Sequence, residues 1–181
     1  MNTTSPDIRI LHAESTDEMA LFRHLAGELL VEYGFDLSFQ NVDEEMLHLP
    51  GKYAAPEGAI LLAFVNDVPA GCVAMRPLER HICEMKRLYV RPEYRSLKVG
   101  RSLSEELLKT AKARGYGFMR LDTRREMMPR AVALYASLGF YEIPPYNVNP
   151  FPDIYYMECD IARSLYLRRE ALTYDGNTRQ G

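Results

Sequence analysis

Two kinds of apolar pattern alternate along this chain of 181 residues. In some stretches apolar residues recur every three or four positions, which indicates helices; between them lie short apolar runs bounded by Gly, Pro, Asn or Asp, which indicate strands. The patterns predict strands at 8–11, 59–65, 70–75, 81–90, 118–123, 141–143 and 154–160, and helices at 15–34, 43–49, 99–113 and 129–139. Because hairpins and crossover helices occur in one chain, we expect an α/β (α+β) fold, a mixed central sheet of about six to seven strands with helices on both faces.

Length and composition limit the class of protein. About 100–200 residues per domain is usual, so we expect one domain over residues 1–160 and a C-terminal extension, 161–181, that begins as a helix and then frays. Lys and Arg number 22 and Asp and Glu 25, for a net charge of −3, which argues against a generally basic nucleic-acid binder. No apolar run reaches the roughly 18 residues of a membrane helix, and no secretory signal is visible. We expect a cytoplasmic protein without a nucleic-acid or membrane partner.

The three cysteines, Cys72, Cys83 and Cys159, are widely spaced and lie in apolar, strand-like contexts. An odd number at this spacing fits neither a disulfide scaffold nor a zinc site. We therefore expect buried free thiols in a reducing compartment, and no metal site.

One segment departs from the acidic average. Residues 86–101 carry a local charge of +5, from the single acid Glu93 and six bases: Lys86, Arg87, Arg91, Arg95, Lys98 and Arg101. The predicted strand ends near Pro92 and the next helix begins near Val99, so backbone N–H groups and the positive end of a helix dipole point to one place. Such a junction is a natural phosphate site, where Gly100 allows a close approach. A solvated basic face is the alternative.

Two motifs resemble those of the GNAT N-acetyltransferase family. Residues 88–103, LYVRPEYRSLKVGRSL, resemble its acyl-coenzyme A loop, in which a strand leads into R/Q-x-x-G-x-G/A and a long helix. Lys98 stands where the family usually has Gly, and Ser96 where Gly is frequent. Residues 131–140, AVALYASLGF, are similar to the family's A-x-x-LY-x-x-x-GF segment, although Met128 stands where Asn is common. The resemblance extends from Ile8 to Asp160, so residues 1–160 are expected to form a GNAT acetyltransferase domain with a strand splayed for acyl-CoA.

The resemblance implies acetyl-CoA as the cofactor. Backbone amides around Leu88, Tyr89 and Val90 would stabilise the thioester oxyanion and pair with the pantetheine arm. The loop and the first helical turn would hold the pyrophosphate through Arg95, Ser96, Leu97, Lys98, Val99, Gly100, Arg101 and Ser102. Lys98 would present its backbone N–H at a negative φ, and with Met128 it raises the question of weakened cofactor binding.

The resemblance also implies two catalytic groups. Tyr135, in the LY position, would give a proton to the leaving thiolate; a core aromatic is the alternative. Glu84, on the same predicted strand as the oxyanion segment, would deprotonate the amine; a structural ion pair with Lys86 or Arg76 is the alternative. His81 is a second candidate for the base.

The acceptor pocket is expected to involve Tyr33, Tyr53 and Arg76, with Arg76 clamping a carboxylate of the acceptor. Tyr146 and Asn149 are also candidates for this pocket, and of the two readings we favour that of simple loop residues. The sequence therefore predicts an N-acetyltransferase that acts on a primary amine of a small amino acid or peptide-like molecule. A non-catalytic acyl-CoA-binding or sensing module on the same fold is the alternative, and homodimer formation is left open.

Overall fold

The computed structural model describes residues 6–34, 42–149 and 151–164. Seven strands form one mixed sheet in the order β1-β2-β3-β4-β5-β7-β6, in which β4 and β5 are parallel and the β1–β2, β2–β3, β5–β7 and β6–β7 pairs are antiparallel. The strands are β1 (Ile8–His12), β2 (Ala59–Val65), β3 (Val68–Glu79), β4 (Ile82–Val90), β5 (Phe118–Arg124), β6 (Tyr141–Glu142) and β7 (Ile154–Asp160). The predicted mixed sheet and its strand sequence are confirmed.

The helices also follow the predicted order. The α-helices are α1 (Thr16–Glu32), α2 (Val42–Leu47), α3 (Val99–Ala113) and α4 (Pro129–Leu138), and the 3-10 helices are η2 (Gly51–Tyr53), η3 (Pro92–Leu97) and η4 (Ile161–Arg163). The chain folds as two compact units: Met1–Pro77 with Met85–Leu107, and Leu78–Glu84 with Leu108–Gly181. Both β4 and α3 therefore begin in one unit and end in the other.

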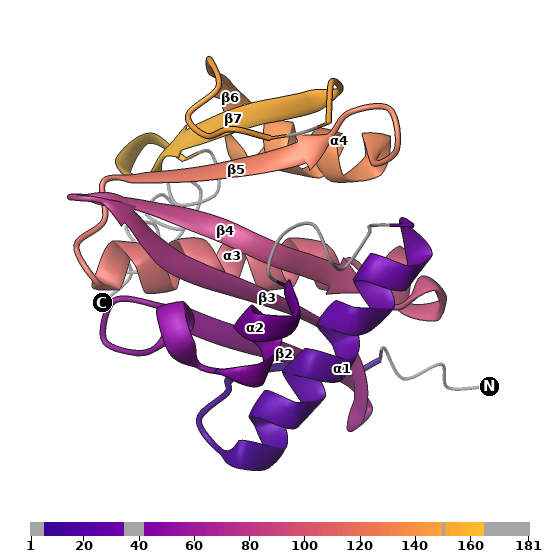
Figure 1. The fold of residues 1–181 in the computed structure, drawn as a ribbon. Helices are drawn as coiled ribbons and strands as arrows, with labels where there is room; N and C mark the ends of the chain where they lie inside the picture. The colour runs from indigo at the N-terminus through magenta and orange to yellow at the C-terminus, as the bar shows by residue number, and fades with distance from the viewer. Residues whose placement is uncertain (1–5, 35–41, 150, 165–181) are drawn as a thin grey trace, which may run out of the picture. The chain divides into compact units, whose positions relative to one another are not determined.

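In the first unit, α1 and α2 lie on the viewer's side of β2 and β3, and α3 lies behind the strands (Figure 1). A capping box starts α1: the Glu18 amide donates to Ser15 Oγ (3.2 Å), and the Ser15 amide donates to Glu18 Oε2 (2.8 Å). The helix then buries one apolar stripe, consisting of Phe22, Leu25, Ala26, Leu29 and Leu30. Local sequence and apolar burial agree here, which is why the helix is predicted well.

The β2–β3 hairpin turns at Asn66 and Asp67, whose φ angles of 48° and 63° are both left-handed. This is the geometry of a type I′ turn, which suits the twist of the paired strands. The structure corrects the predicted strand 70–75, because β3 extends over Val68–Glu79. Pro69 lies within β3 opposite Phe64, where the β2–β3 register shifts. A strand accommodates a proline at such an irregularity because a ladder hydrogen bond is already missing.

In the second unit, β5 pairs with β7 over seven residues, from Phe118 opposite Asp160 to Arg124 opposite Ile154. It pairs in parallel with β4 over three, Ile82–Glu84 opposite Phe118–Arg120. Helix α4 ends at Gly139, whose φ of 100° requires the freedom of glycine. The buried core of this unit includes Met119, Leu121, Leu138, Phe140 and Met157.

The expected helical start of the C-terminal extension is a single 3-10 turn, η4, instead of an α-helix. The Asp160 side chain caps it by accepting the Arg163 amide (3.2 Å), and the buried Ser164 hydroxyl donates to Leu138 O (2.9 Å). The extension beyond residue 164 lies outside the described residues.

We expect Gly71→Ala to destabilise the protein, because a Cβ there would lie 2.4 Å from Tyr89 O and 3.3 Å from Val90 Cα. The cost should be about 1–3 kcal/mol in the free energy of unfolding, measured by urea denaturation. Gly27→Ala is the matched control: no atom lies within 4 Å of its added Cβ, and alanine inside α1 should stabilise by about 0.5–1 kcal/mol. Equal stability of the two variants would contradict the close approach of β3 to Tyr89.

Candidate active site

Strand β4 carries a residue in a conformation that strands rarely contain. Arg87 has a φ of 59°, and a left-handed residue within a strand is typical of a β-bulge, which redirects the backbone that follows. The Cys72 thiol donates to Arg87 O (3.4 Å), and the Arg87 guanidinium lies 3.3 Å from Glu45 Oε1 with each side chain only 8% exposed. This left-handed residue immediately precedes Leu88–Val90, the segment expected to stabilise the oxyanion.

Two ion pairs with α1 hold the segment after β4. Arg91 forms a forked pair with Glu28, at 2.7 Å and 3.0 Å, and Arg95 contacts both oxygens of Glu32, at 2.7 Å and 2.6 Å. Arg95 Nε also donates to Val90 O (3.0 Å). Glu28 and Glu32 are one helical turn apart, so one face of α1 holds two points of the loop. Arg95, predicted as a cofactor ligand, is therefore also a clamp on the loop.

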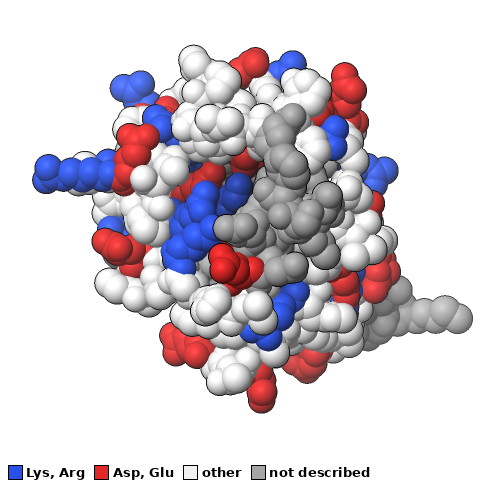
Figure 2. Space-filling model, viewed as in Figure 1, with Lys and Arg blue, Asp and Glu red and all other residues white. Residues whose placement is uncertain are grey.

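These pairs change the electrostatics of the basic segment. The hydrogen bond from Arg91 lowers the pKa of Glu28, despite the opposing effect of desolvation. On the face that Figure 2 shows, acidic and basic side chains are interspersed. Part of the charge of residues 86–101 is thus paired with acids on α1, and a uniform basic face does not describe this segment.

Lys98 adopts φ 63° and ψ 17°, directly after η3. The expected negative φ is wrong: the lysine takes the left-handed conformation that a glycine would adopt at this position of the motif. A right-handed residue followed by a left-handed one turns successive backbone N–H groups toward one point, which forms a concave anion-binding nest. The side chains of Lys98 and Ser96 are exposed, whereas Leu97 is half-buried. The backbone after η3 therefore has the right-handed to left-handed sequence that such a nest requires.

The first turn of α3 continues this nest. Val99 is fully buried and anchors the helix start, while Gly100, Arg101 and Ser102 are half-buried. The first helical hydrogen bond runs from the Ser102 amide to Lys98 O (3.0 Å). The amides of Val99 and Gly100 come before that bond and lie at the positive end of the helix dipole.

Tyr53 and Glu45 form a buried polar cluster in the first unit. Tyr53 is 2% exposed and packs edge-on against Phe22, with ring centroids 6.1 Å apart. Its hydroxyl donates to Glu45 Oε1 (2.6 Å), and Lys52 Nζ lies 2.5 Å from Glu45 Oε2. Glu45 also lines a pocket of about 290 Å³ together with Glu44, His48, Pro50, Gly51, Lys52 and Tyr53.

The cluster fixes the charge state of Glu45. Burial raises the pKa of the carboxyl, but the Arg87 charge and hydrogen bonds from Lys52 and Tyr53 outweigh it and lower the pKa to about 2. Arg76, half-buried on β3, is close enough to act electrostatically on Tyr53. Tyr33, which was predicted to join these residues in the pocket, is the C-cap of α1 and acts electrostatically on Arg95 instead. The structure thus places Arg76 within electrostatic range of Tyr53, and Tyr33 within electrostatic range of Arg95 on the loop.

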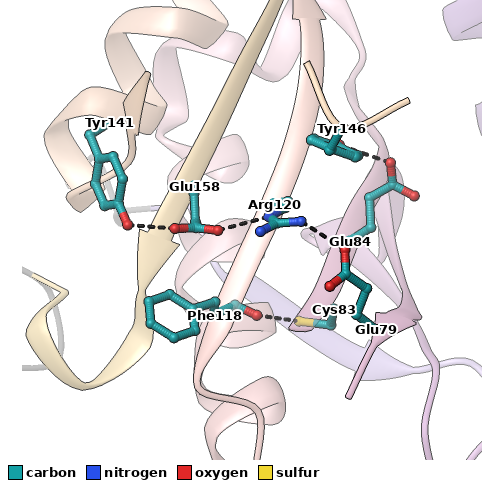
Figure 3. A network of polar contacts seen from close by, with 8 residues as sticks. All are labelled: Glu79, Cys83, Glu84, Phe118, Arg120, Tyr141, Tyr146 and Glu158. Atoms are coloured by element: carbon teal, nitrogen blue, oxygen red, sulfur yellow. Dashed lines mark hydrogen bonds and ion pairs between the residues drawn. The ribbon is translucent and has the colours of Figure 1, made fainter. Parts of the chain in front are cut away.

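Glu84 lies in the second unit and is fully buried. The Tyr146 hydroxyl donates to Glu84 Oε1 (2.9 Å), as Figure 3 shows. The sequence reading of Tyr146 as a simple loop residue missed this contact, and no periodicity in its Pro- and Asn-rich loop could have indicated it. Asn149, read in the same way, donates to Asp122 Oδ2 (3.3 Å). His81, the second candidate base, is exposed in the β3–β4 turn with a φ of 68°.

Tyr135 lies on α4 in the same unit, 6% exposed, with its ring 5.7 Å from that of Phe140. Cys72, Cys83 and Cys159 are free and buried, as predicted. Burial raises the pKa of Cys83 and Cys159 to about 12, which makes both thiols poor nucleophiles. Over residues 6–34, 42–149 and 151–164, no group of three or more His, Cys, Asp or Glu could hold a metal ion.

Comparison with known proteins places these features in a family. Residues 22–140 match the model of the acetyltransferase (GNAT) family. An uncharacterized N-acetyltransferase of Schizosaccharomyces pombe is 44% identical over 144 residues, which are 78% of this chain and 88% of that protein. An uncharacterized N-acetyltransferase of Dictyostelium discoideum is 29% identical over 205 residues, covering 79% and 93%.

Solved structures agree on the fold. A GNAT acetyltransferase of Staphylococcus aureus superposes with a TM-score of 0.73 at 19% identity, covering 86% of this chain and 99% of that one. The PaiA N-acetyltransferase of Thermoplasma acidophilum, solved in complex with coenzyme A, gives 0.69 at 21% identity, covering 85% and 99%. This chain belongs to the GNAT acetyltransferase family, and it is an acyltransferase. Within the described residues no helix is long and apolar enough to cross a membrane.

We expect Lys98→Gly to be more stable than Lys98→Ala by about 1 kcal/mol, because only glycine takes the left-handed conformation without steric cost. Both variants lose the ammonium group, so calorimetric titration with coenzyme A isolates its contribution. If the lysine contacts a phosphate, both should bind several-fold more weakly than the wild type. Equal stability of the two variants would show that the left-handed backbone is not maintained in solution.

The buried cluster predicts a pH-dependent loss of stability. The pKa of Glu45 lies near 2 in the folded protein against an ordinary 4.5, so its contribution is complete above about pH 4.5 and is lost as the pH falls toward 2. The wild type should lose about 1–2 kcal/mol more than Glu45→Gln between pH 7 and pH 3.5, measured by urea unfolding at each pH. Parallel pH profiles for the two proteins would contradict the assigned pairing.

Proposed function

We propose that this enzyme transfers the acetyl group of acetyl-CoA to a primary amine of a small amino acid or peptide-like acceptor. The observation that carries the proposal is Glu84, a fully buried carboxylate that accepts a hydrogen bond from Tyr146. Burying a carboxylic acid is costly, and such groups concentrate at functional sites. On β4 it lies a few residues before the left-handed Arg87 and the expected oxyanion amides.

The cofactor would be held by the loop and first helical turn. Bound acetyl-CoA would supply an activated acyl group as a thioester. The backbone N–H groups around the left-handed Lys98 and in the first turn of α3 would bind its pyrophosphate. The side chains of Ser96, Arg101 and Ser102 would add polar groups to the same loop and turn. Arg95 would act mainly by holding the loop to Glu32 and to Val90 O. Backbone amides of Leu88–Val90 would stabilise charge that develops on the thioester oxygen.

Two side chains would move protons. Glu84 would accept a proton from the acceptor's ammonium group, which frees the nitrogen lone pair for attack at the acyl carbon. A C–N bond then forms and the C–S bond breaks, and the nitrogen releases its second proton, which restores the Tyr135 phenol after that phenol has protonated the sulfur. Tyr135 would donate its phenolic proton at the departing sulfur, since an ordinary phenol is protonated near neutral pH.

The acceptor class is proposed from the charges in the first unit. Arg76 acts electrostatically on Tyr53, whose hydroxyl is held by Glu45. Arg87 and Lys52 act electrostatically on Glu45, and Arg76 acts on Tyr53. An arginine at this place favours an acceptor that carries its own carboxylate. Tyr53 would contribute to the wall of the neighbouring pocket, and Tyr33 would approach the acceptor from the side of the loop.

The alternative is a non-catalytic acyl-CoA-binding or sensing module. Two departures from the family pattern favour it, Lys98 and Met128. The Met128 side chain gives α4 no capping hydrogen bond, and its Sδ accepts the Thr123 hydroxyl at 3.6 Å. In that case coenzyme A would bind without turnover for any amine.

We also propose that residues 1–160 form the acetyltransferase domain and 161–181 an extension of it. The three buried free thiols support a reducing compartment such as the cytoplasm. Formation of a homodimer is left to measurement by light scattering.

The testing experiment combines binding with turnover. Calorimetric titration with acetyl-CoA should give micromolar binding for the wild type, Glu84→Gln and Tyr135→Phe. A free-thiol assay with a panel of amines should then show kcat lowered by about 10²-fold in each variant. Binding without turnover for all amines would support the sensing module, whereas unchanged kcat in both variants would remove their catalytic roles.

A matched acceptor pair tests the carboxylate clamp. Each amino acid should be a better acceptor than its amide, and Arg76→Met should reduce that preference through KM. A preference that is absent in the wild type would overturn the proposed acceptor class and leave the proposed reaction intact.

A further inference from the structure

Tyr146 lies among the polar contacts of the second unit that Figure 3 draws, where a dashed line joins it to Glu84. Its hydroxyl donates to Glu84 Oε1 (2.9 Å), and the Arg120 guanidinium lies 5.5 Å from the centre of its ring. Its ring also meets Tyr156 edge-on, with centroids 5.3 Å apart and an interplanar angle of 75°. Three residues from β4, β5 and β7 therefore contact one side chain of an irregular loop.

Arg120 is itself held in place. Its Nε lies 2.7 Å from Glu158 Oε2, and its Nη1 lies 3.0 Å from Glu79 Oε1. The Tyr141 hydroxyl donates to the other oxygen of Glu158 (2.6 Å). With two carboxylates fixing the guanidinium, Arg120 presents a stationary cation to the Tyr146 ring.

We propose that Tyr146 is a positioning residue for the reaction, which fixes the Glu84 carboxylate by a donated hydrogen bond and is itself oriented by Arg120 and Tyr156. The inference rests on the proposed function, in which Glu84 is the base. The donated hydrogen bond fixes the orientation of the carboxylate toward the acceptor amine, and hydrogen bonds donated to a carboxylate in general favour its charged form. Arg120 would act on the reaction only through Tyr146.

Several titratable or charged groups surround this arrangement. They come from β3, β4, β5, β6 and β7 and comprise Glu79, Cys83, Arg120, Tyr141, Tyr156 and Glu158. Burial keeps Cys83 and Tyr156 uncharged near neutral pH, because it raises the pKa of both. The two outer glutamates are paired with Arg120, so the donor nearest to Glu84 among these contacts is the Tyr146 hydroxyl.

The test is the pH profile of kcat/KM for Tyr146→Phe, which removes the hydroxyl and retains the ring. We expect the acidic limb to move to higher pH by about one unit, because a hydrogen bond to a charged group contributes on this scale. At neutral pH kcat should fall by about three- to thirtyfold, with the KM for acetyl-CoA unchanged. A merely structural role would lower activity at all pH values without moving the limb.

Tyr141→Phe is the matched control, since it also removes a tyrosine hydroxyl that donates to a glutamate, but to Glu158. It should keep the wild-type profile. A wild-type profile for Tyr146→Phe beside an inactive Glu84→Gln would overturn the positioning role and leave Glu84 as the base. A wild-type profile for Glu84→Gln would instead remove the proposed base, and the inference with it.

A second measurement needs no acceptor. Carbon-13 labelling of glutamate allows the Glu84 carboxyl signal to be assigned by its loss in Glu84→Gln. Its titration should move to higher pH in Tyr146→Phe and stay in place in Tyr141→Phe. Identical titrations in all three proteins would overturn the inference whatever the acceptor.

Discussion

The buried pair between Glu45 and Arg87 is the interaction on which the proposed oxyanion segment depends. A left-handed arginine within a strand is unfavourable by itself, and its φ of 59° persists because the guanidinium meets a carboxylate with both side chains almost inaccessible to water. Breaking such a pair would leave an uncompensated buried charge. The left-handed conformation of Arg87 is therefore held by a long-range contact from α2, directly before the three residues of the proposed oxyanion segment.

The loop after β4 is held by the same kind of chemistry in a more exposed setting. Two glutamates one turn apart on α1 engage Arg91 and Arg95, and Arg95 also reaches back to Val90 O. Single exposed ion pairs contribute little. Here both pairs come from the same helix, and one of the arginines also binds a backbone carbonyl. Together these contacts restrict the conformation of the loop more than their energies alone would suggest. Arginines that look from the sequence like phosphate ligands thereby act first on the backbone that would hold the phosphate.

The sequence predicts the regular elements well because local and tertiary preferences agree in them. The capping box at Ser15 and the Asn66–Asp67 turn are local signals with one favoured geometry each. The predictions fail where a contact between residues far apart in the sequence determines the local structure. Pro69 reads as a breaker but lies at a register shift within β3. Tyr146 reads as loop because its partner, Glu84, is 62 positions away. The GNAT motifs indicate which residues to consider at the site, but not which of them hold one another.

At Lys98 the loop has a left-handed backbone, although the motif's usual glycine is replaced by a lysine. The turn needs a left-handed conformation between η3 and α3, and glycine supplies it without steric cost. Here neighbouring anchors impose it on a lysine: Arg95 is tied to Glu32 on one side, and Val99 is fully buried on the other. The strain of about 1–2 kcal/mol is small against those contacts. In return, the departure from glycine would add an exposed ammonium group to the proposed pyrophosphate site.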